Sequence, residues 1–425
     1  MTNRSGSPIW HPFTQHGLLP SMMPIASASG AWLETRDGTK LLDAISSWWV
    51  ITHGHCHPKI VDAISQQAQT LDQVIFAGFT HEPAETLARG LIDFAPRGLE
   101  HVFFSDSGST SVEVALKMAL GYFRNIGEAR SRIVAFEHAY HGDTVGSMSV
   151  GARGVFSSPY EPLLFDVLRI PFPSAGNEQL TIDAFAAACA AGDVAALIVE
   201  PLILGAGGML MYDASVLREL RRVADAHGVL LIADEVMTGW GRTGRMLACD
   251  VATIAPDIMC LAKGITGGSM PLAATLCTAP IFDAHRSHDR SRMFFHSSSY
   301  TANPIACAAA VANLEIWRDE PVVDRLAALV DAHAARLAAF RDNPHFENVR
   351  QLGTIAALDF KVADGGYLAS VAPALSRYFL ERGVLLRPLG NTIYVMPPYC
   401  ITGQELDLVY SAIADAPDWL ARQTA

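Results

Sequence analysis

The sequence predicts an α/β fold, with a large domain built on a mainly parallel sheet flanked by helices and a smaller α+β domain formed from both termini. Two observations predict this class. Short aliphatic runs bounded by polar residues or glycine recur through the middle of the chain, and such runs are typical of strands buried on both faces of a sheet. Stretches with apolar residues at helical spacing separate several of these runs, which indicates a parallel sheet covered by helices on both faces.

The large domain is assigned to residues 51–310 on the strength of its strands. The expected strands are, in chain order, His101–Ser105, Arg132–Phe136, Val194–Glu200, Val229–Asp234 and Ile258–Ala262. Helices are expected between several of them, for example at Val112–Tyr122 and Val216–His227.

The smaller domain is assigned to residues 311–425, where the composition of the sequence changes. Helices rich in Ala, Leu and Arg are followed there by strand-like segments at Gly353–Phe360 and Thr392–Met396. Residues 1–50 are expected to pack beside this domain as an N-terminal segment. No internal repeat or low-complexity linker is visible.

Composition restricts the function. With 425 residues, 50% of them hydrophobic and 17% charged, the chain can bury a large core. A net charge of −12 without Lys/Arg clusters argues against a nucleic-acid partner and favours a small-molecule substrate. No apolar segment is long enough to span a membrane, so no membrane partner is expected. Seven cysteines without CxxC spacing, and an N-terminus without the apolar stretch of a secretory signal, predict a cytoplasmic protein.

Three predicted strands end in or next to Glu200, Asp234 and Lys263. Because functional groups gather beyond the carboxyl ends of parallel strands, we expect these side chains to converge. A lysine that forms a Schiff base and a buried aspartate that keeps a pyridine nitrogen protonated are the minimum equipment for pyridoxal 5′-phosphate (PLP) chemistry. We therefore interpret Lys263 and Asp234 as the core of a PLP site, whereas Glu200 taken alone fits a helix cap equally well.

A phosphate site is predicted at Asp106–Thr110, which follows one predicted strand and opens a helix. The free N–H groups of that helix start attract an anion, Gly108 allows close approach and Ser109 offers a hydroxyl. Ordinary helix capping is the alternative for this segment taken alone. Tyr140 follows another strand and is expected to stack on the cofactor ring, with a tyrosine of the core as the alternative.

Together these segments resemble the class III aminotransferases of PLP fold type I, in order and over nearly the whole chain. The segments that carry the resemblance are Asp106–Ser109, Tyr140–Asp143, Glu200–Pro201, Asp234–Gly244 and Ala262–Gly264. The resemblance implies pyridoxal 5′-phosphate as cofactor. It also implies a homodimer with shared active sites at the subunit interface, each completed by residues of the neighbour.

Within this class, the chain is most similar to the enzymes that aminate 8-amino-7-oxononanoate to 7,8-diaminononanoate in biotin biosynthesis. The similarity rests on Ile9–Phe13, Ser46–Trp49, His53–Gly54, Leu204–Met209, Arg387–Gly390 and Ile393–Tyr399. It implies S-adenosylmethionine as the amino donor, while lysine remains an open alternative.

The resemblance implies roles for individual residues. The cofactor-binding residues would be Gly108, Ser109, Tyr140, Asp234, Lys263, Ser298 and Ser299. Lys263 would be the catalytic residue that binds the cofactor covalently and moves the proton. Ser299, with Ser298 adding a second hydroxyl, would reach the neighbouring subunit's phosphate.

The substrate-binding residues implied in the same way are Phe13, Trp48, Tyr140, Ser297 and Arg387. Arg387 would bind the carboxylate of the oxo substrate and Trp48 would line the pocket. A long aliphatic chain that ends in a carboxylate independently calls for an aromatic wall and one fixed arginine. Without the resemblance, core packing is the alternative for Trp48 and Trp49.

Two positions depart from the patterns of the family. Many class III members have glutamine at the position of Met237, and a thioether cannot donate the amide's hydrogen bond. Phe13 stands where the biotin enzymes often have tyrosine, so the ring is kept and a hydroxyl is lost. The apolar Met237 favours the biotin enzymes, although they tend to have a smaller residue there.

Other interpretations stay open. The run His53–His57 invites a metal site, but no further ligand set is evident and no metal is expected. The chain could instead be another class III transaminase for an ω-amino acid or diamine, or an aminomutase of the same fold, against which Trp48, Met237 and Arg387 argue. An inactive PLP-fold regulator is the remaining alternative, and the intact Lys263 and Asp234 argue against it.

Overall fold

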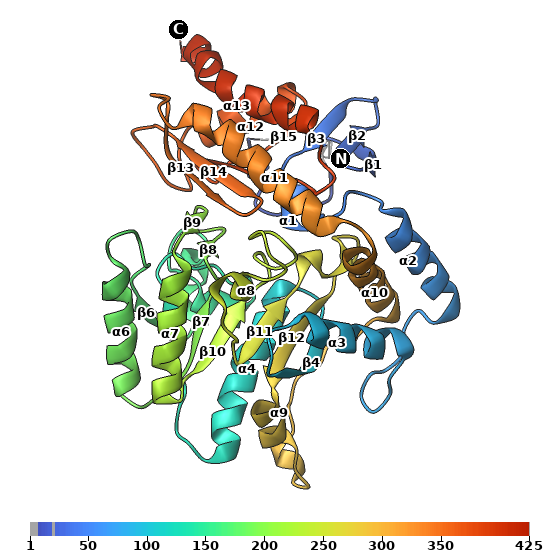
Figure 1. Ribbon diagram of the computed structural model, residues 1–425, viewed down its shortest axis with the longest axis vertical. Coiled ribbons are helices and arrows are strands. Elements are labelled where there is room, and N and C mark those ends of the chain that lie inside the picture. Colours follow the sequence, from blue (N-terminus) through green and yellow to red (C-terminus); the bar gives the residue numbers. More distant parts are fainter. Residues whose placement is uncertain (1–6, 19–21, 425) are drawn as a thin grey trace, which may run out of the picture.

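A seven-stranded sheet forms the centre of the larger lobe of the molecule (Figure 1). The structure is a computed structural model that describes residues 7–18 and 22–424. The strands are, in spatial order, β4 (Leu99–Ser105), β12 (Ala273–Thr278), β11 (Ile258–Leu261), β10 (Leu230–Asp234), β7 (Val194–Val199), β5 (Arg132–Phe136) and β6 (Leu168–Ile170). All of them run parallel except β12, which is antiparallel to both β11 and β4. The predicted mainly parallel sheet is confirmed.

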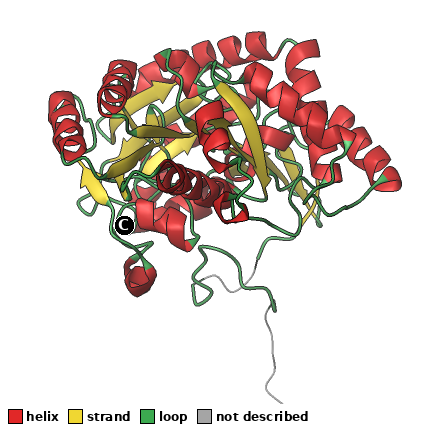
Figure 2. Ribbon diagram, turned by 90° about the horizontal axis from the view of Figure 1, so that it is seen from below, coloured by secondary structure: helices red, strands yellow, loops and turns green. Residues whose placement is uncertain are grey.

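Helices cover both faces of this sheet because successive strand residues point to opposite sides (Figure 2). In β5, Ile133 and Ala135 pack with the face of α4 (Gly108–Ile126). Val134 and Phe136 of the same strand join a separate cluster with α6 (Glu178–Ala190) and α7 (Ala214–His227). Both clusters exclude water, so the loops at the strand ends are the part of the sheet that remains open to a ligand.

The strands predicted for the large domain are all present, with ends that differ by up to two residues. Two strands of this sheet were not expected from the sequence: β6, which has only three residues, and β12. The β12 run Ala-Ala-Thr-Leu-Cys-Thr is composed largely of small residues and lacks the long aliphatic side chains that marked its neighbours. Burial between two strands, rather than local propensity, makes this segment a strand.

The smaller lobe contains segments from both the N-terminal and the C-terminal parts of the chain. One sheet contains β1 (Ile25–Ser29), β2 (Trp32–Thr35), β3 (Lys40–Asp43) and β15 (Val384–Leu385). A second contains β13 (Phe346–Leu352), β14 (Ile355–Phe360) and β16 (Thr392–Val395). The helices α11 (Val322–Leu337), α12 (Ala372–Glu381) and α13 (Gly403–Thr424) pack with these sheets at the top of Figure 1. The parallel pairing of β3 with β15 brings the N-terminal segment onto this lobe.

The remaining helices complete the larger lobe. They are α2 (Pro58–Thr70), α3 (Glu82–Phe94), α5 (Val145–Val150), α8 (Ala248–Ala252), α9 (Ala279–His285) and α10 (Pro304–Asp319). Short elements are α1 (Ser46–Trp49), the hairpin β8 (Ile203–Leu204) and β9 (Leu210–Met211), and the 3-10 turns η1 (Ser158–Leu163), η2 (Lys263–Thr266), η3 (Arg290–Arg292) and η4 (Ala338–Phe340). Within the described ranges, no helix has the length and apolar character needed to cross a membrane.

The division expected at residues 310 and 311 falls inside α10, which runs unbroken from Pro304 to Asp319 and packs on α2 and α3. A division after that helix, near Glu320 and Pro321, therefore fits the elements better. Of the expected N-terminal segment, residues 1–6 and 19–21 lie outside the described residues.

We predict that the turn between β13 and β14 tolerates only glycine at position 353. Gly353 has φ +54° and its backbone lies against the segment Arg242–Gly244, so an added Cβ would collide with main-chain atoms. Gly353→Ala should lower the free energy of unfolding by about 3 kcal/mol or more.

The matched control is Gly30→Ala, at φ +59° with no described heavy atom near the added Cβ, which should cost only the backbone strain of about 1–2 kcal/mol. Urea unfolding of both variants measures the difference. Equal losses of the free energy of unfolding in the two variants would show that the collision with residues 242–244 adds nothing to the cost of the backbone strain.

Candidate functional site

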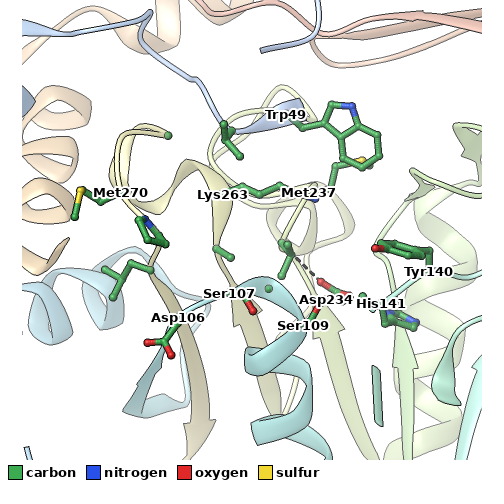
Figure 3. Close-up of a pocket in the computed structure, with 18 of the residues that line it drawn as sticks. Trp49, Asp106, Ser107, Ser109, Tyr140, His141, Asp234, Met237, Lys263 and Met270 are labelled. Atoms are coloured by element: carbon green, nitrogen blue, oxygen red, sulfur yellow. Dashed lines mark hydrogen bonds and ion pairs between the residues drawn. The ribbon is translucent and has the colours of Figure 1, made fainter. Parts of the chain in front are cut away.

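A cavity of about 380 Å³ lies at the carboxyl ends of the parallel strands (Figure 3). The loops after β4, β5, β7, β10 and β11 each contribute to its lining. Among the residues expected from the sequence, those in the lining are Gly108, Ser109, Tyr140, Glu200, Asp234, Met237 and Lys263. The predicted convergence of strand-end side chains is confirmed.

Lys263 begins the turn η2 directly after β11, at φ +48°. Asn313 fixes this turn because its side-chain amide donates to the carbonyls of Gly264 and Ile265, at 3.1 Å each. Burial lowers the pKa of Lys263 to about 8, although the nearby carboxylates Asp234 and Glu200 act in the opposite direction. The amine is therefore far more available as a base near neutral pH than an exposed lysine.

Asp234 presents a carboxylate that is held on both oxygens. His141 Nδ1 donates to Oδ2 at 2.7 Å, and the N–H of Val236 donates to Oδ1 at 3.1 Å. Both His141 and Asp234 are buried, so the carboxylate is kept in place without solvent. The contact of His141 with Asp234 was not predicted from the sequence, where the position of His141 next to Tyr140 was the available signal.

Glu200 lies behind Tyr140 at the end of β7. Its carboxylate accepts the N–H of Tyr140 and the N–H of Gly205, both at 2.9 Å. Neither donor belongs to a helix, so Glu200 does not serve as a helix cap. Burial raises the pKa of Glu200 to about 7, with the Asp234 charge adding to the effect and His141 opposing it.

The start of α4 forms the anion-binding end of the cavity. Ser107 caps the helix through a reciprocal arrangement with Thr110, and the backbone of Gly108 and Ser109 follows in the first turn. Ser109 Oγ accepts the N–H of Asp143 at 3.1 Å, which leaves its own hydroxyl hydrogen for a ligand. N–H groups in a first helical turn have no intrahelical acceptor, so this end favours a phosphate.

The lining matches the parts of pyridoxal 5′-phosphate. Lys263 can form a covalent bond to its carbonyl carbon, Asp234 can pair with its pyridine nitrogen, and the first turn of α4 can hold its phosphate. The buried Asp234–His141 pair is the observation that decides the fit, because a fixed anion deep in a cavity is suited to a ring cation. Tyr140 lines the same cavity, as the stacking prediction requires.

Trp49, and not Trp48, lines the cavity, which differs from the prediction. The Trp49 ring is buried, with Lys263 Nζ 4.6 Å from its centroid, whereas Trp48 is 37% exposed. The cause is the backbone of Ser46–Trp49, where all residues have positive φ and form a left-handed turn. Left-handed backbone costs a non-glycine residue roughly 1–2 kcal/mol, so this turn needs support from its surroundings.

Phe13, Trp48 and Arg387 lie together next to the cavity, although none of them is in its lining. Trp48 adjoins the lining residue Trp49 in the chain, and Phe156 connects Phe13 to the lining residue Tyr140, so we call this group the mouth of the cavity. The guanidinium of Arg387 lies over the Trp48 ring at 4.6 Å and donates to the Phe13 carbonyl at 3.1 Å. The Phe13 ring packs edge-on against Trp48 at 5.6 Å and against Phe156 at 5.9 Å. Tyr367 packs on Phe156 at 4.4 Å. Phe156 and Tyr367 were missed because nothing in their local sequence distinguishes them from core aromatics.

Ser297, Ser298 and Ser299 do not line the cavity of this chain. Ser297 and Ser299 are exposed, and Ser298 Oγ donates to Asp106 at 2.5 Å. Their predicted roles in substrate and phosphate binding therefore depend on a second subunit.

The run His53–His57 does not converge on a common point. The contacts are His53 with Asn313 at 2.9 Å, His55 with Asp43 at 2.8 Å and His57 with Glu320 at 3.2 Å. Within residues 7–18 and 22–424, no group of three or more His, Cys, Asp or Glu side chains could hold a metal ion.

Comparisons with known proteins agree on one family. The model of the class-III aminotransferases matches residues 14–416. The adenosylmethionine-8-amino-7-oxononanoate aminotransferase of Synechococcus elongatus is 50% identical, covering 96% of this chain and 98% of its own. The crystal structure of the enzyme of that name from Methanocaldococcus jannaschii has a TM-score of 0.91 at 33% identity, over 96% and 97% of the chains. An amine transaminase from an uncultivated Pseudomonas species, solved with PLP bound, also has a TM-score of 0.91, at 34% identity over 96% and 98%.

We predict that Met237 is accommodated only because residue 205 is glycine. A Cβ at Gly205 would collide with the Met237 sulfur and approach the Trp49 ring at 3.3 Å. Gly205→Ala should therefore destabilise the protein by about 1–3 kcal/mol through overpacking. In the Gly205→Ala/Met237→Ala double variant the new methyl group fills part of the vacated space.

The loss in the double variant should be smaller than the sum of the single losses by about 1 kcal/mol or more. Urea unfolding of the wild type and the three variants gives this coupling energy. Additive losses would mean that the two residues do not compete for the same space.

Proposed function

The chain belongs to the class-III aminotransferases, and from this premise we propose that it transfers an amino group to 8-amino-7-oxononanoate, giving 7,8-diaminononanoate in biotin biosynthesis. Relatives that carry the corresponding name, at 33–50% identity over nearly the whole chain, support the proposal. The structural observation that carries it is Arg387, a fixed guanidinium held against Trp48 at the cavity mouth. An apolar chain that ends in a carboxylate is the ligand that such a pair recognises.

Pyridoxal 5′-phosphate is the cofactor of this family, and Lys263, Asp234 and the first turn of α4 are the groups that would hold it here. When bound, it supplies an electron sink for the α-carbon of the amino donor. Asp234 contributes a carboxylate at the base of the site, and His141 keeps that carboxylate from turning away.

Lys263 is the residue that moves the proton. A general acid and base works best when its pKa lies near the operating pH, and burial places the pKa of Lys263 at about 8. The Trp49 ring covers one side of Nζ and limits the access of water to the amine.

The cavity mouth has to accept the substrates in turn. Arg387 can pair with the terminal carboxylate of the oxo substrate, while Phe13 and Trp48 provide an apolar wall for its chain. We propose S-adenosylmethionine as the amino donor, since the faces of the aromatic rings are also suited to a sulfonium cation. The missing hydroxyl at Phe13 means that no hydrogen bond from this side chain contributes to donor binding.

We propose that the protein forms a homodimer with shared active sites and is located in the cytoplasm. Ser297 and Ser299 are exposed near the large apolar side chains Phe295 and Tyr300, which are 60% and 64% exposed. Such a combination supports an interface at which these serines complete the neighbouring site. The seven unpaired cysteines support a reducing location.

The second candidate is a class-III transaminase for simple amines or ω-amino acids, which the similarity to the Pseudomonas amine transaminase favours. Purified enzyme assayed with 8-amino-7-oxononanoate, and with adenosylmethionine, lysine and ω-amino acids as alternative donors, separates these functions. We expect 7,8-diaminononanoate to form with adenosylmethionine. Turnover of simple amines without turnover of 8-amino-7-oxononanoate would support the second candidate.

The same assay tests Arg387. Arg387→Met keeps much of the side chain's apolar volume and removes its charge, so the KM for 8-amino-7-oxononanoate should rise by about 10- to 100-fold, as for the loss of a charged hydrogen bond. Arg377→Met, on α12 against Trp419 of α13, is the control and should leave KM unchanged. An unchanged KM in Arg387→Met would remove this residue from the substrate site.

We also predict the pH dependence of cofactor capture by the apoprotein. Only the neutral amine attacks a carbonyl, and the neutral fraction rises with pH through the pKa of Lys263, about 8 instead of the ordinary 10.5. The rate of covalent pyridoxal phosphate capture should therefore rise and level off just above pH 8. Stopped-flow absorbance measures this rate.

A rate that continues to climb toward the ordinary lysine value would contradict the buried environment. Lys263→Ala is the control and should show no absorbance band of lysine-bound cofactor at any pH. Persistence of that band would exclude Lys263 as the covalent site.

A further inference from the structure

The left-handed turn Ser46–Trp49 places Trp49 in the cavity and Trp48 beside Arg387. Nothing in the sequence of the turn favours a left-handed backbone. The φ angles of the turn are 53°, 47°, 78° and 74°, all on non-glycine residues. We propose that Asp43, fixed by His55, is the positioning residue that holds this turn and thereby sets the substrate-binding geometry of Trp48 and Trp49.

Asp43 is fully buried directly before the turn, at the end of β3. Its Oδ1 accepts the N–H of Ser47 at 2.9 Å and the N–H of Ile45 at 3.3 Å. Its Oδ2 accepts the hydroxyl of Ser47 at 2.7 Å. One carboxylate thus binds both the backbone N–H and the hydroxyl of Ser47, the second residue of the left-handed turn.

His55 holds the carboxylate from the opposite side. His55 Nε2 lies 2.8 Å from Asp43 Oδ2, and since a carboxylate only accepts, the ring nitrogen donates. The His55 backbone is itself fixed by paired hydrogen bonds with Gly30, at 2.7 and 3.3 Å. This arrangement gives one histidine of the run His53–His57 a structural role.

The turn connects the tryptophans to the groups that meet the ligands. Trp48 carries the Arg387 guanidinium on its ring at 4.6 Å, and Trp49 has Lys263 Nζ at the same distance. A rotation of the turn would move both rings together, because they are adjacent on one short rigid element. The printed hydrogen bonds of Asp43 go to Ile45, Ser47 and His55 and to neither ring, so it acts on the substrate through the turn.

A second contact fixes the turn to the smaller lobe. Ser46 Oγ donates to the Met396 carbonyl at 2.8 Å, and the Met396 N–H donates to Ala44 at the same distance. These bonds hold the start of the turn and do not involve Ser47. Asp43 supplies the support at Ser47.

The expected effect of Asp43 on the oxo-acid substrate rests on the proposed function, whereas its effect on the position of the turn can be measured without any substrate. Asp43→Ala removes all contacts of the carboxylate, whereas Asp43→Asn keeps an oxygen that can accept the N–H of Ser47. The control is Asp257→Ala, which removes a carboxylate that accepts the N–H of Leu231 and binds Arg221 at the far end of β10, away from the cavity.

Near-ultraviolet circular dichroism of the apoprotein gives the first measurement, since it reports the fixed environment of tryptophan rings and needs no substrate. Asp43→Ala should lose part of the tryptophan signal, Asp43→Asn should recover most of it, and Asp257→Ala should retain it even if its Tm falls. The Trp48→Phe variant identifies the share of the signal that belongs to the turn. Wild-type spectra for Asp43→Ala would overturn the inference whether or not the enzyme uses 8-amino-7-oxononanoate.

Steady-state kinetics give the second measurement. In Asp43→Ala the KM for 8-amino-7-oxononanoate should rise about tenfold, the effect of losing the cation–π contact of a correctly placed Trp48, with a smaller change in kcat. If Asp43→Ala does not fold, His55→Leu removes one contact and should show the same changes to a lesser degree. An equal rise in KM for Asp257→Ala, or no rise in either Asp43→Ala or His55→Leu, would show that Asp43 is merely structural.

Discussion

The structure depends on burying a lysine and carboxylates together at one edge of a parallel sheet. Removing such groups from water is costly unless each finds partners. Asp234 has His141 and the Val236 N–H, and Glu200 has the N–H groups of Tyr140 and Gly205. Lys263 has no direct anionic partner among the described hydrogen bonds and ion pairs, and burial lowers its pKa. The strand ends thus supply the charges, while their loops supply the compensating donors.

At the junction between the lobes, a buried arginine is also stabilised by partners within the protein. Arg242 is almost fully buried and donates to the carbonyls of Pro397 and Ile51, at 2.9 and 2.8 Å, with its guanidinium over the Tyr399 ring. Burial lowers its pKa, yet a guanidinium remains charged in proteins. Together with the left-handed turn, this arginine ties the cavity mouth to the smaller lobe. The mouth is therefore shaped by both lobes at once.

Much of the site was predictable because it lies on strongly patterned elements. Lys263, Asp234 and Gly108 each follow an aliphatic run, and the direction of parallel strands brings such ends together. β12 was missed because its small side chains give no periodic signal. Which of the two tryptophans enters the cavity could not be predicted, since a left-handed backbone at four consecutive non-glycine residues has no local sequence signature.

The sequence by itself determined the fold class, the family and the cofactor chemistry, because these follow from the order of strands and from a few residues at their ends. Only the tertiary structure decided which tryptophan faces the lysine, that His141 supports Asp234, that Phe156 and Tyr367 extend the aromatic mouth, and that His55 serves Asp43. Each of these contacts joins segments that are distant in the chain or reverses a local preference. The energies of these contacts come from packing and desolvation across the fold, and a local sequence pattern does not predict them.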